Sequence, residues 1–594
     1  MFRFKTLVQF SIAVISIVLS SLVLDEARLT LARDKGGSSP VFVSPRFAEP
    51  KDKEDQENEA PESVDSTNDS VDVDLPNDDA TDPSASSESS STTVEVEEPD
   101  EPPQDAASNE DALENVTALD DDSYDVYKEN GHYFVDWEKP ELALVFTGLT
   151  NGYIEPCGCA GMARMKGGLS RRATFLKELR ETRDWNVVAI DTGQITVGFG
   201  VQEELKFDMA MNAYKMMEYD AVGIGKGELR FPASFLLTFT APTSSTDESL
   251  YVSSNVGVYG YHPTYTLPYK VIERGGKKIG VTSVVFGDET TKSRDNNILL
   301  EDPEKKLQSA ASALEKEGCD ICVLIVHGSE QESLRLAKTF PIFNYVLTSD
   351  SASEPPSELQ SIGKDQSLIE VGEKGKYAVV LGLYPDGQAR YQRVALDSRY
   401  ESNPDITLLM KDYQSILKVK ITTEGFRAGL GINPARSPQS EILGKYVGSQ
   451  KCRSCHEEPY RVWIKSDHAS AWKSLKETAN PPRDFDPECI SCHVVGWNSL
   501  QHLPYVDGYS SERKTPELEN VGCESCHGQG EFHIAAEVGS DEKLQERLRA
   551  AMRLGDNVKK VCYQCHDGDN SPAFEFDKYY PLIEHVDEDS LEDE

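Results

Sequence analysis

The sequence predicts a layered α/β domain in the middle of the chain and a mainly α, loop-rich region after it, with a long acidic linker in front of both. Three observations predict this organisation. Apolar runs alternate with helical patterns in residues 124–420, one cysteine–histidine motif recurs four times in residues 445–594, and residues 33–123 hold almost no aromatic side chains. A chain of 594 residues has room for several domains.

The first 32 residues are predicted to be a signal peptide or an N-terminal anchor. Arg3 and Lys5 precede an apolar run over residues 7–24, which is the pattern of an export signal. The run is at the border of the length that spans a bilayer, so a cleaved and an uncleaved segment both remain open. We therefore expect an extracytoplasmic, periplasmic protein that is soluble or tethered to the membrane through its N-terminus.

Residues 33–123 are rich in Asp, Glu, Ser and Pro, a composition that predicts a disordered, self-repelling spacer. The whole chain has 60 Lys and Arg against 102 Asp and Glu, a net charge of −42. This acidity excludes nucleic acid as a partner, because phosphates demand basic neutralisation. It favours a redox partner protein with a basic docking surface, provided that the chain carries electrons.

Residues 124–420 predict strands and helices in alternation, and residues 421–444 a connector with Gly and Pro. Helices between strands imply parallel pairing, with helices on both faces of the sheet. Strands are expected at 142–146, 187–190, 221–224, 279–285 and 321–326. Helices are expected at 169–180, 209–217, 303–317 and 330–340.

The C-terminal region carries four copies of Cys-x-x-Cys-His, numbered here from the first to the fourth motif. Two thiols three positions apart can each add to one vinyl group of a haem, and the next residue then presents its imidazole to the iron. A disulfide or a zinc ribbon is the alternative, but zinc sites need cysteine pairs grouped in fours without an obligatory histidine. We expect four c-type haems. The attachment residues are Cys452 and Cys455, Cys489 and Cys492, Cys523 and Cys526, and Cys562 and Cys565, with His456, His493, His527 and His566 as proximal ligands.

Four further histidines in this region are candidates for the distal ligands: His468, His502, His533 and His585. Met552 is its only methionine, so two imidazoles per iron is the natural stoichiometry, and such centres suit electron transfer at low potential. His468 lies twelve residues after His456 on a helical pattern, which is roughly 18 Å along the axis. It is therefore expected to serve a different haem, as is His533, which follows His527 closely.

The same region resembles the tetrahaem cytochrome c-554 family. The resemblance rests on residues 446–452 with Trp463 and His468, on residues 522–530 with His533, and on residues 562–566 with the late His585. It implies a cytochrome that accepts and passes electrons and in which one haem can lack a distal ligand. His502 does not match the family pattern, so the haem of the second motif is expected to be open, with closure by His502 as the alternative.

The α/β region resembles the calcineurin-like metallophosphatases, in their 5′-nucleotidase branch, through residues 147–159, 167–173, 187–194 and 223–228. That resemblance implies a two-metal site on loops at the carboxyl ends of strands. Its ligand positions fall on Leu149, Asn151, Gln194, Lys226 and Gly227, and near residues 348–351, so that only His327 remains as an expected ligand. Leu149 cannot bind a hard cation and Lys226 adds a positive charge, which predicts a catalytically degenerate domain.

Another set of side chains is expected at the same sheet edge: Cys157 and Cys159 with His327, near Asp191 and Glu228. Two thiolates and an imidazole suit an additional soft metal or a redox site, and oxidised cysteines are the alternative.

Cys319 and Cys322 are interpreted as buried core or a structural disulfide rather than as a redox pair, because Cys322 enters a strand. His132 and His262 are taken as structural.

Three functions are compatible with these patterns. The first is an extracytoplasmic electron-transfer cytochrome whose degenerate nucleotidase-like domain serves docking or ligand binding. The second is an oxidoreductase acting on a small nitrogen compound at an open haem, and the third is a metal-dependent phosphoesterase with an attached cytochrome. The sequence favours an electron-transfer protein over a hydrolase.

Overall fold

The computed structural model describes residues 124–158, 161–241, 248–260, 265–287, 293 and 295–585. The predicted signal segment and acidic linker lie outside these residues, as do Cys159 and His262. All the described residues belong to one compact unit. Among these described residues, none of the helices combines the length and the apolar character that a membrane crossing requires.

The first sheet has six strands in the order β14-β13-β1-β2-β3-β4. Its centre is parallel, because β1 pairs with β2, β2 with β3 and β3 with β4 in the same direction. The other side is antiparallel, since β13 runs against both β1 and β14. The bounds are Leu142–Thr147 for β1, Val187–Asp191 for β2, Ala221–Gly223 for β3, Tyr251–Val252 for β4, Tyr377–Leu383 for β13 and Ala389–Ala395 for β14.

The second sheet also has six strands, in the order β11-β12-β10-β9-β7-β6. Its central strands β12, β10, β9 and β7 are parallel, and β6 and β11 are antiparallel edges. The bounds are Lys270–Arg274 for β6, Lys277–Val285 for β7, Ile321–His327 for β9, Tyr345–Thr348 for β10, Gln360–Ser361 for β11 and Ser367–Ile369 for β12. A separate antiparallel pair joins β5 (Val256–Val258) to β8 (Ile298–Leu300).

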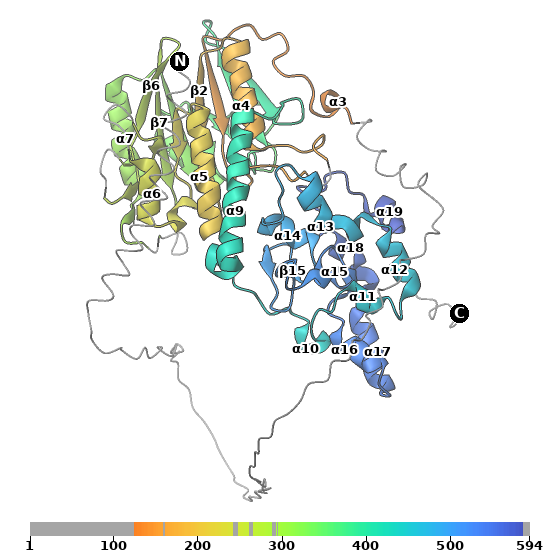
Figure 1. The fold of residues 1–594 in the computed structure, drawn as a ribbon. Helices are drawn as coiled ribbons and strands as arrows, with labels where there is room; N and C mark the ends of the chain where they lie inside the picture. Colours follow the sequence, from red (N-terminus) through yellow and green to blue (C-terminus); the bar gives the residue numbers. More distant parts are fainter. Residues whose placement is uncertain are drawn as a thin grey trace, which may run out of the picture. The chain divides into compact units, whose positions relative to one another are not determined.

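The two sheets pack face to face, and the helices cover only their outer faces (Figure 1). Leu144 and Phe146 of β1 meet Val281 of β7 and Ile325 of β9 in a core between the sheets. The next residues of β1, Ala143 and Val145, point to the opposite face and pack against α4 (Leu169–Lys177), α5 (Val201–Met216) and α9 (Pro404–Leu430).

The outer face of the second sheet is covered by α7 (Pro303–Glu317) and α8 (Glu330–Thr339). The prediction of a layered α/β fold is confirmed, but the layers are helix, sheet, sheet and helix, rather than one sheet with helices on both faces. The continuous burial of β1 explains the difference, because one face meets helices and the other meets a second sheet.

Local signals fix these helix ends. Asp302 caps α7 by accepting from the backbone N–H groups of Glu304 and Lys305, and Gly318 ends the helix in a left-handed conformation. In α8, Ser329 and Glu332 form a capping box. The predicted helix at 209–217 begins earlier, at Val201, and α9 continues through residue 420 to Leu430, with a kink at Gly425. The predicted connector therefore begins inside a helix.

The C-terminal region consists of short helices with little strand, as expected. One small core joins Trp472, Ile490, Val495 and Trp497. Its main helices are α11 (Ser449–Cys452), α12 (Glu457–Ile464), α14 (Pro487–His493), α15 (Cys523–His527), α16 (Glu531–Glu537), α17 (Glu542–Met552) and α18 (Val558–Cys562). The other short elements after α9 are α10 (Ser440–Leu443), α13 (Ala471–Lys473), α19 (Phe576–Tyr579), β15 (Trp497–Asn498) and β16 (Leu503–Pro504), while α3 (Val126–Asn130) and α6 (Ala233–Thr240) belong to the α/β domain.

Candidate haem centres and the adjoining sheet edge

Each Cys-x-x-Cys-His motif folds as a turn of helix. The second and third motifs lie in α14 and α15, while α11 and α18 end at the first cysteines of the first and fourth motifs. In those two the backbone N–H of the histidine donates to the carbonyl of the first cysteine, over 3.0 Å for His456 and 2.9 Å for His566. Residues three apart lie on one side of a helix, so both thiols of a motif can reach one porphyrin.

Three pairs of histidines from different segments bring their rings close together, one pair stacked and two tilted. The ring centroids are 6.1 Å apart for His456 and His533, 6.0 Å for His566 and His468, and 5.9 Å for His527 and His585. Two imidazoles on opposite sides of one iron place their donor nitrogens about 4 Å apart and their ring centres about 2 Å further. The three pairs therefore fit the two axial ligands of an iron, and each joins a motif to a histidine from another segment.

Hydrogen bonds to Nδ1 fix the orientation of several of these rings. Nδ1 of His493 is 2.6 Å from the carbonyl of Ala471, and Nδ1 of His527 is 2.9 Å from that of Met552. Nδ1 of His566 is 3.0 Å from the hydroxyl of Ser571. A ring that donates from Nδ1 leaves Nε2 as the nitrogen for a metal, which is the usual arrangement of a ligating histidine. Met552 thus contributes a backbone carbonyl to this region.

The remaining distal candidate, His502, has a different environment. Its Nδ1 lies 3.0 Å from the hydroxyl of Ser491, in the second motif. Burial lowers the pKa of His502, Glu488 raises it and Lys206 lowers it, so these two charged side chains are its neighbours. His502 therefore lies near Lys206 of the α/β domain, and the open haem of the second motif, with closure by His502 as the alternative, stays a prediction.

The attachment cysteines of different motifs lie next to one another. Cys452 of the first motif contacts Cys523 of the third, and Cys565 of the fourth contacts Cys492 of the second. Cys526 of the third motif lies close enough to Cys562 of the fourth to be influenced by its charge. If haems were attached to these cysteines, the same proximity would bring neighbouring haem groups close together. The motifs are connected in the order first, third, fourth, second.

The carboxyl edge of the first sheet carries the positions at which the metallophosphatase resemblance places metal ligands. The loops after β1 and β2 run side by side, with the backbone N–H groups of Leu149 and Asn151 donating to Gly193 and Gln194, each over 3.1 Å. Leu149, Asn151 and Gln194 have φ of 47°, 52° and 56°, a left-handed backbone that asparagine adopts readily but that is uncommon for leucine and glutamine. The loops keep this backbone conformation although the Leu149 side chain has no atom that could bind a metal ion.

A buried ion pair stands beside these loops. Nη1 of Arg172 lies 3.1 Å from Oδ2 of Asp191, and both side chains are at most 1% exposed. The Asp191 carboxylate also accepts from the hydroxyls of Thr147 and Tyr214 and from the N–H of Gly193. Asp191 is therefore saturated by the protein's own donors. Sequence patterns did not indicate this role for Arg172, since one arginine in an amphipathic helix is typical of a surface charge.

The other residues predicted at the sheet edge, His327, Glu228 and Cys157, each have different partners. Nε2 of His327 lies 2.6 Å from the carbonyl of Thr192, and burial lowers the pKa of His327 to about 4, so the ring is neutral. Burial raises the pKa of Glu228 to about 7, against the backbone N–H groups of Ile195 and Gly225 that bond it. Cys157 lies near Cys489 of the second motif.

Among the described residues, no cluster of three or more His, Cys, Asp or Glu side chains could hold a metal ion. Cys159 lies outside them, so the site of Cys157, Cys159 and His327 stays a prediction.

Cys319 and Cys322 are adjacent thiols that hydrogen-bond to each other without a disulfide. Burial raises the pKa of Cys322 to about 12, as expected for a core thiol. His132 stacks on Tyr127 at 4.8 Å, in keeping with a structural role.

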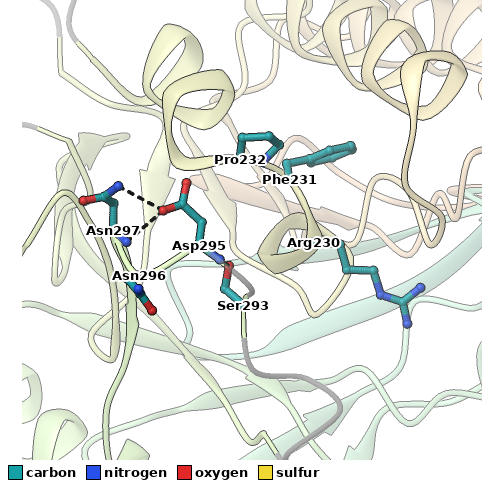
Figure 2. Close-up of a pocket in the computed structure, with 7 residues that line it drawn as sticks. All are labelled: Arg230, Phe231, Pro232, Ser293, Asp295, Asn296 and Asn297. Atoms are coloured by element: carbon teal, nitrogen blue, oxygen red, sulfur yellow. Dashed lines mark hydrogen bonds between the residues drawn. The ribbon is translucent and has the colours of Figure 1, made fainter. Parts of the chain in front are cut away.

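A cavity of about 460 Å³ opens beside the N-terminus of α6, lined by residues of two loops (Figure 2). Its one carboxylate, Asp295, accepts from both the backbone and the side-chain nitrogens of Asn297, and also from the N–H of Ala233. These contacts lie within the loop of Asp295 and between that loop and the first residue of α6. The cavity holds none of the predicted site residues. Its carboxylate holds the loop around Asn297 against the N-terminus of α6.

Comparison with known proteins agrees with the two halves of this description. Residues 451–528 match the family model described as cytochrome c554 and c-prime. A stretch of 97 residues is 36% identical to cytochrome c-554 of Nitrosomonas europaea, and covers 14% of this chain and 39% of that protein. The C-terminal region resembles cytochrome c-554.

The α/β region is 26% identical over 312 residues to the snake venom 5′-nucleotidase of Crotalus adamanteus, covering 48% of this chain and 50% of that protein. The chain thus spans about half the length of the nucleotidase relatives. Among solved structures, a 5′-nucleotidase precursor of Thermus thermophilus aligns with a TM-score of 0.39 at 18% identity, covering 47% of this chain and 59% of that one.

Proposed function

We propose that the protein is an extracytoplasmic multihaem c-type cytochrome that carries electrons through four covalently bound haems, named haem 1 to haem 4 after their motifs. The three facing histidine pairs carry this proposal, because each brings a motif histidine and a distant histidine to the separation that one iron requires. Haem iron supplies one-electron redox chemistry.

The contacts between attachment cysteines support a continuous path for the electrons, from haem 1 through haem 3 and haem 4 to haem 2. Cys455 of the first motif is exposed, whereas the second motif adjoins the α/β domain. We therefore place the exchange with a soluble partner at haem 1. The net charge of −42 favours a basic partner, with association that weakens as salt rises.

The experiment is a redox titration of the full exported chain with visible and electron paramagnetic resonance spectra. We expect four haems per chain, three of them low-spin. Replacing any one of the distal histidines, His468, His533 or His585, should remove one low-spin centre. A chain with haem but without low-spin centres at His456, His527 and His566 contradicts the proposal.

An oxidoreductase acting on a small nitrogen compound at haem 2 is the second candidate. The position of His502 favours it, since this histidine bonds to Ser491 and lies beside Glu488 and Lys206. A high-spin signal that shifts when nitric oxide is added is expected if haem 2 is open. A fully low-spin spectrum that nitric oxide leaves unchanged excludes this activity.

The α/β domain is proposed to be inactive as a phosphoesterase. Leu149 fills a position that should bind metal, and Asp191 is held by Arg172. Docking of the cytochrome region is the role that the geometry supports for the domain, through ion pairs such as Glu155–Arg483 at 2.6 Å.

A further inference from the structure

One edge of the α/β domain contacts the cytochrome region through several charged and polar side chains. Glu155 follows β1, and Gln202 and Lys206 lie in α5, which follows β2; the carboxyl ends of parallel strands share one edge of a sheet. Lys374 and Lys376 precede β13, which is antiparallel to β1, so they lie at that same edge. The loop after β1 that carries Glu155 also carries Leu149 and Asn151, at which the nucleotidase resemblance places metal ligands.

The partners of this edge come from the segment just before the second motif and from the residues just after the fourth motif. Glu155 pairs with Arg483 at 2.6 Å, and Nε2 of Gln202 donates to Asp486 over 3.1 Å. Lys206 pairs with Glu488, and Lys374 and Lys376 both pair with Asp569. The edge is therefore turned toward the segment that leads into Cys489 and toward the residues just after His566.

Lys206 is the most buried cation of this contact. Its side chain is 3% exposed, and its ammonium group bonds the carboxylate of Glu488, the residue directly before Cys489. Burial lowers the pKa of Lys206, but Glu488, Glu203 and Asp486 raise it above the ordinary value, so the side chain is charged. Replacing a buried ion pair by apolar residues of similar volume is often neutral for stability, so stability alone does not account for a buried charge at this position.

We propose that Lys206 is a positioning residue of haem 2: it holds the segment of Glu488 and Cys489 against the α/β domain and places a buried positive charge beside this haem. The inference rests on the proposed function, because it requires a haem at Cys489 and Cys492. A positive charge favours the reduced form of a nearby iron, and its influence is large where water is excluded. Lys206 therefore raises the potential of haem 2 above the value that this haem would have with a neutral side chain at position 206.

The test is a spectroelectrochemical titration of the full chain at mildly alkaline pH, where the carboxylates stay ionised. Lys206→Met is expected to lower the midpoint potential of haem 2 and to shift the other three less. The wave of haem 2 is identified as the one missing from a Cys489→Ala/Cys492→Ala variant. Lys206→Arg keeps the charge and is expected to keep the potential, and Lys215→Met, at an exposed site on the same helix, is the matched control.

The double variant distinguishes an effect of the Lys206 charge on the potential of haem 2 from an effect of lost packing. Lys206→Met/Glu488→Gln removes one charge of each sign, so the potential of haem 2 should return toward the wild-type value. If Lys206→Met does not fold, Glu488→Gln alone is expected to raise the same potential.

An unchanged haem 2 wave in Lys206→Met, or a double variant shifted further than the single one, overturns the inference. A wild-type chain without haem at Cys489 instead overturns the proposed function, so the two failures are distinguishable.

Discussion

Replacing Arg172 with methionine tests whether the sheet edge is held by a structural ion pair in place of metal ions. The substitution leaves Asp191 charged and fully buried, with three neutral donors remaining from Thr147, Tyr214 and Gly193. Removing one partner of a buried pair costs about 3–5 kcal/mol, and the remaining donors favour the lower end of that range. We expect a loss of about 3 kcal/mol in the free energy of unfolding.

The assay is urea unfolding of the full chain. Fluorescence of Trp137 and Trp185 follows the α/β domain, while haem absorbance follows the cytochrome region. Arg172→Met/Asp191→Asn removes the orphaned charge and is expected to lose less stability than Arg172→Met alone. Lys177→Met, at an exposed position of the same helix, should change stability by less than about 0.5 kcal/mol. A loss below about 1 kcal/mol in Arg172→Met would refute the structural role of the pair.

Three further predictions follow from the site. His468→Ala should convert one low-spin haem to high spin in the electron paramagnetic resonance spectrum, because it removes the ring opposite His566, whereas His132→Ala should leave all four unchanged. The pKa of His327 is about 4 when folded and 6.5 by its ordinary value, so acid protonates the unfolded chain first, and stability should fall by about 3 kcal/mol from pH 6.5 to 4. A His327→Gln variant whose stability difference from wild type does not vary over that pH range contradicts this assignment. Phosphatase assays with added manganese should give no activity above background, and a metal-dependent turnover would show that Leu149 and Lys226 do not block the site.

The elements with strong local signals could be predicted from the sequence. The strand over residues 142–146 and the helix over 303–317 match β1 and α7 closely, since uninterrupted apolar character and a capping aspartate decide them. The number of sheets could not be predicted, because a strand buried on both faces has the same pattern under a helix as under a second sheet. Only tertiary packing distinguishes the two.

The candidate site could also be predicted from the sequence only in part. The motif spacing identified the attachment cysteines and proximal histidines as candidates, because that chemistry is local. The pairing of His456 with His533 joins residues far apart in the chain, and no spacing encodes it. The contact between Lys206 and Glu488 joins two domains through two charges that resemble surface residues in the sequence, and its burial emerges only when α5 meets the second motif.

The covalent haem content of the exported chain, measured by intact mass together with its visible spectrum, tests the central claim most directly. The expected result is a polypeptide heavier by four haem masses, with absorption bands that respond to dithionite. A colourless chain with the mass of the bare polypeptide would contradict it.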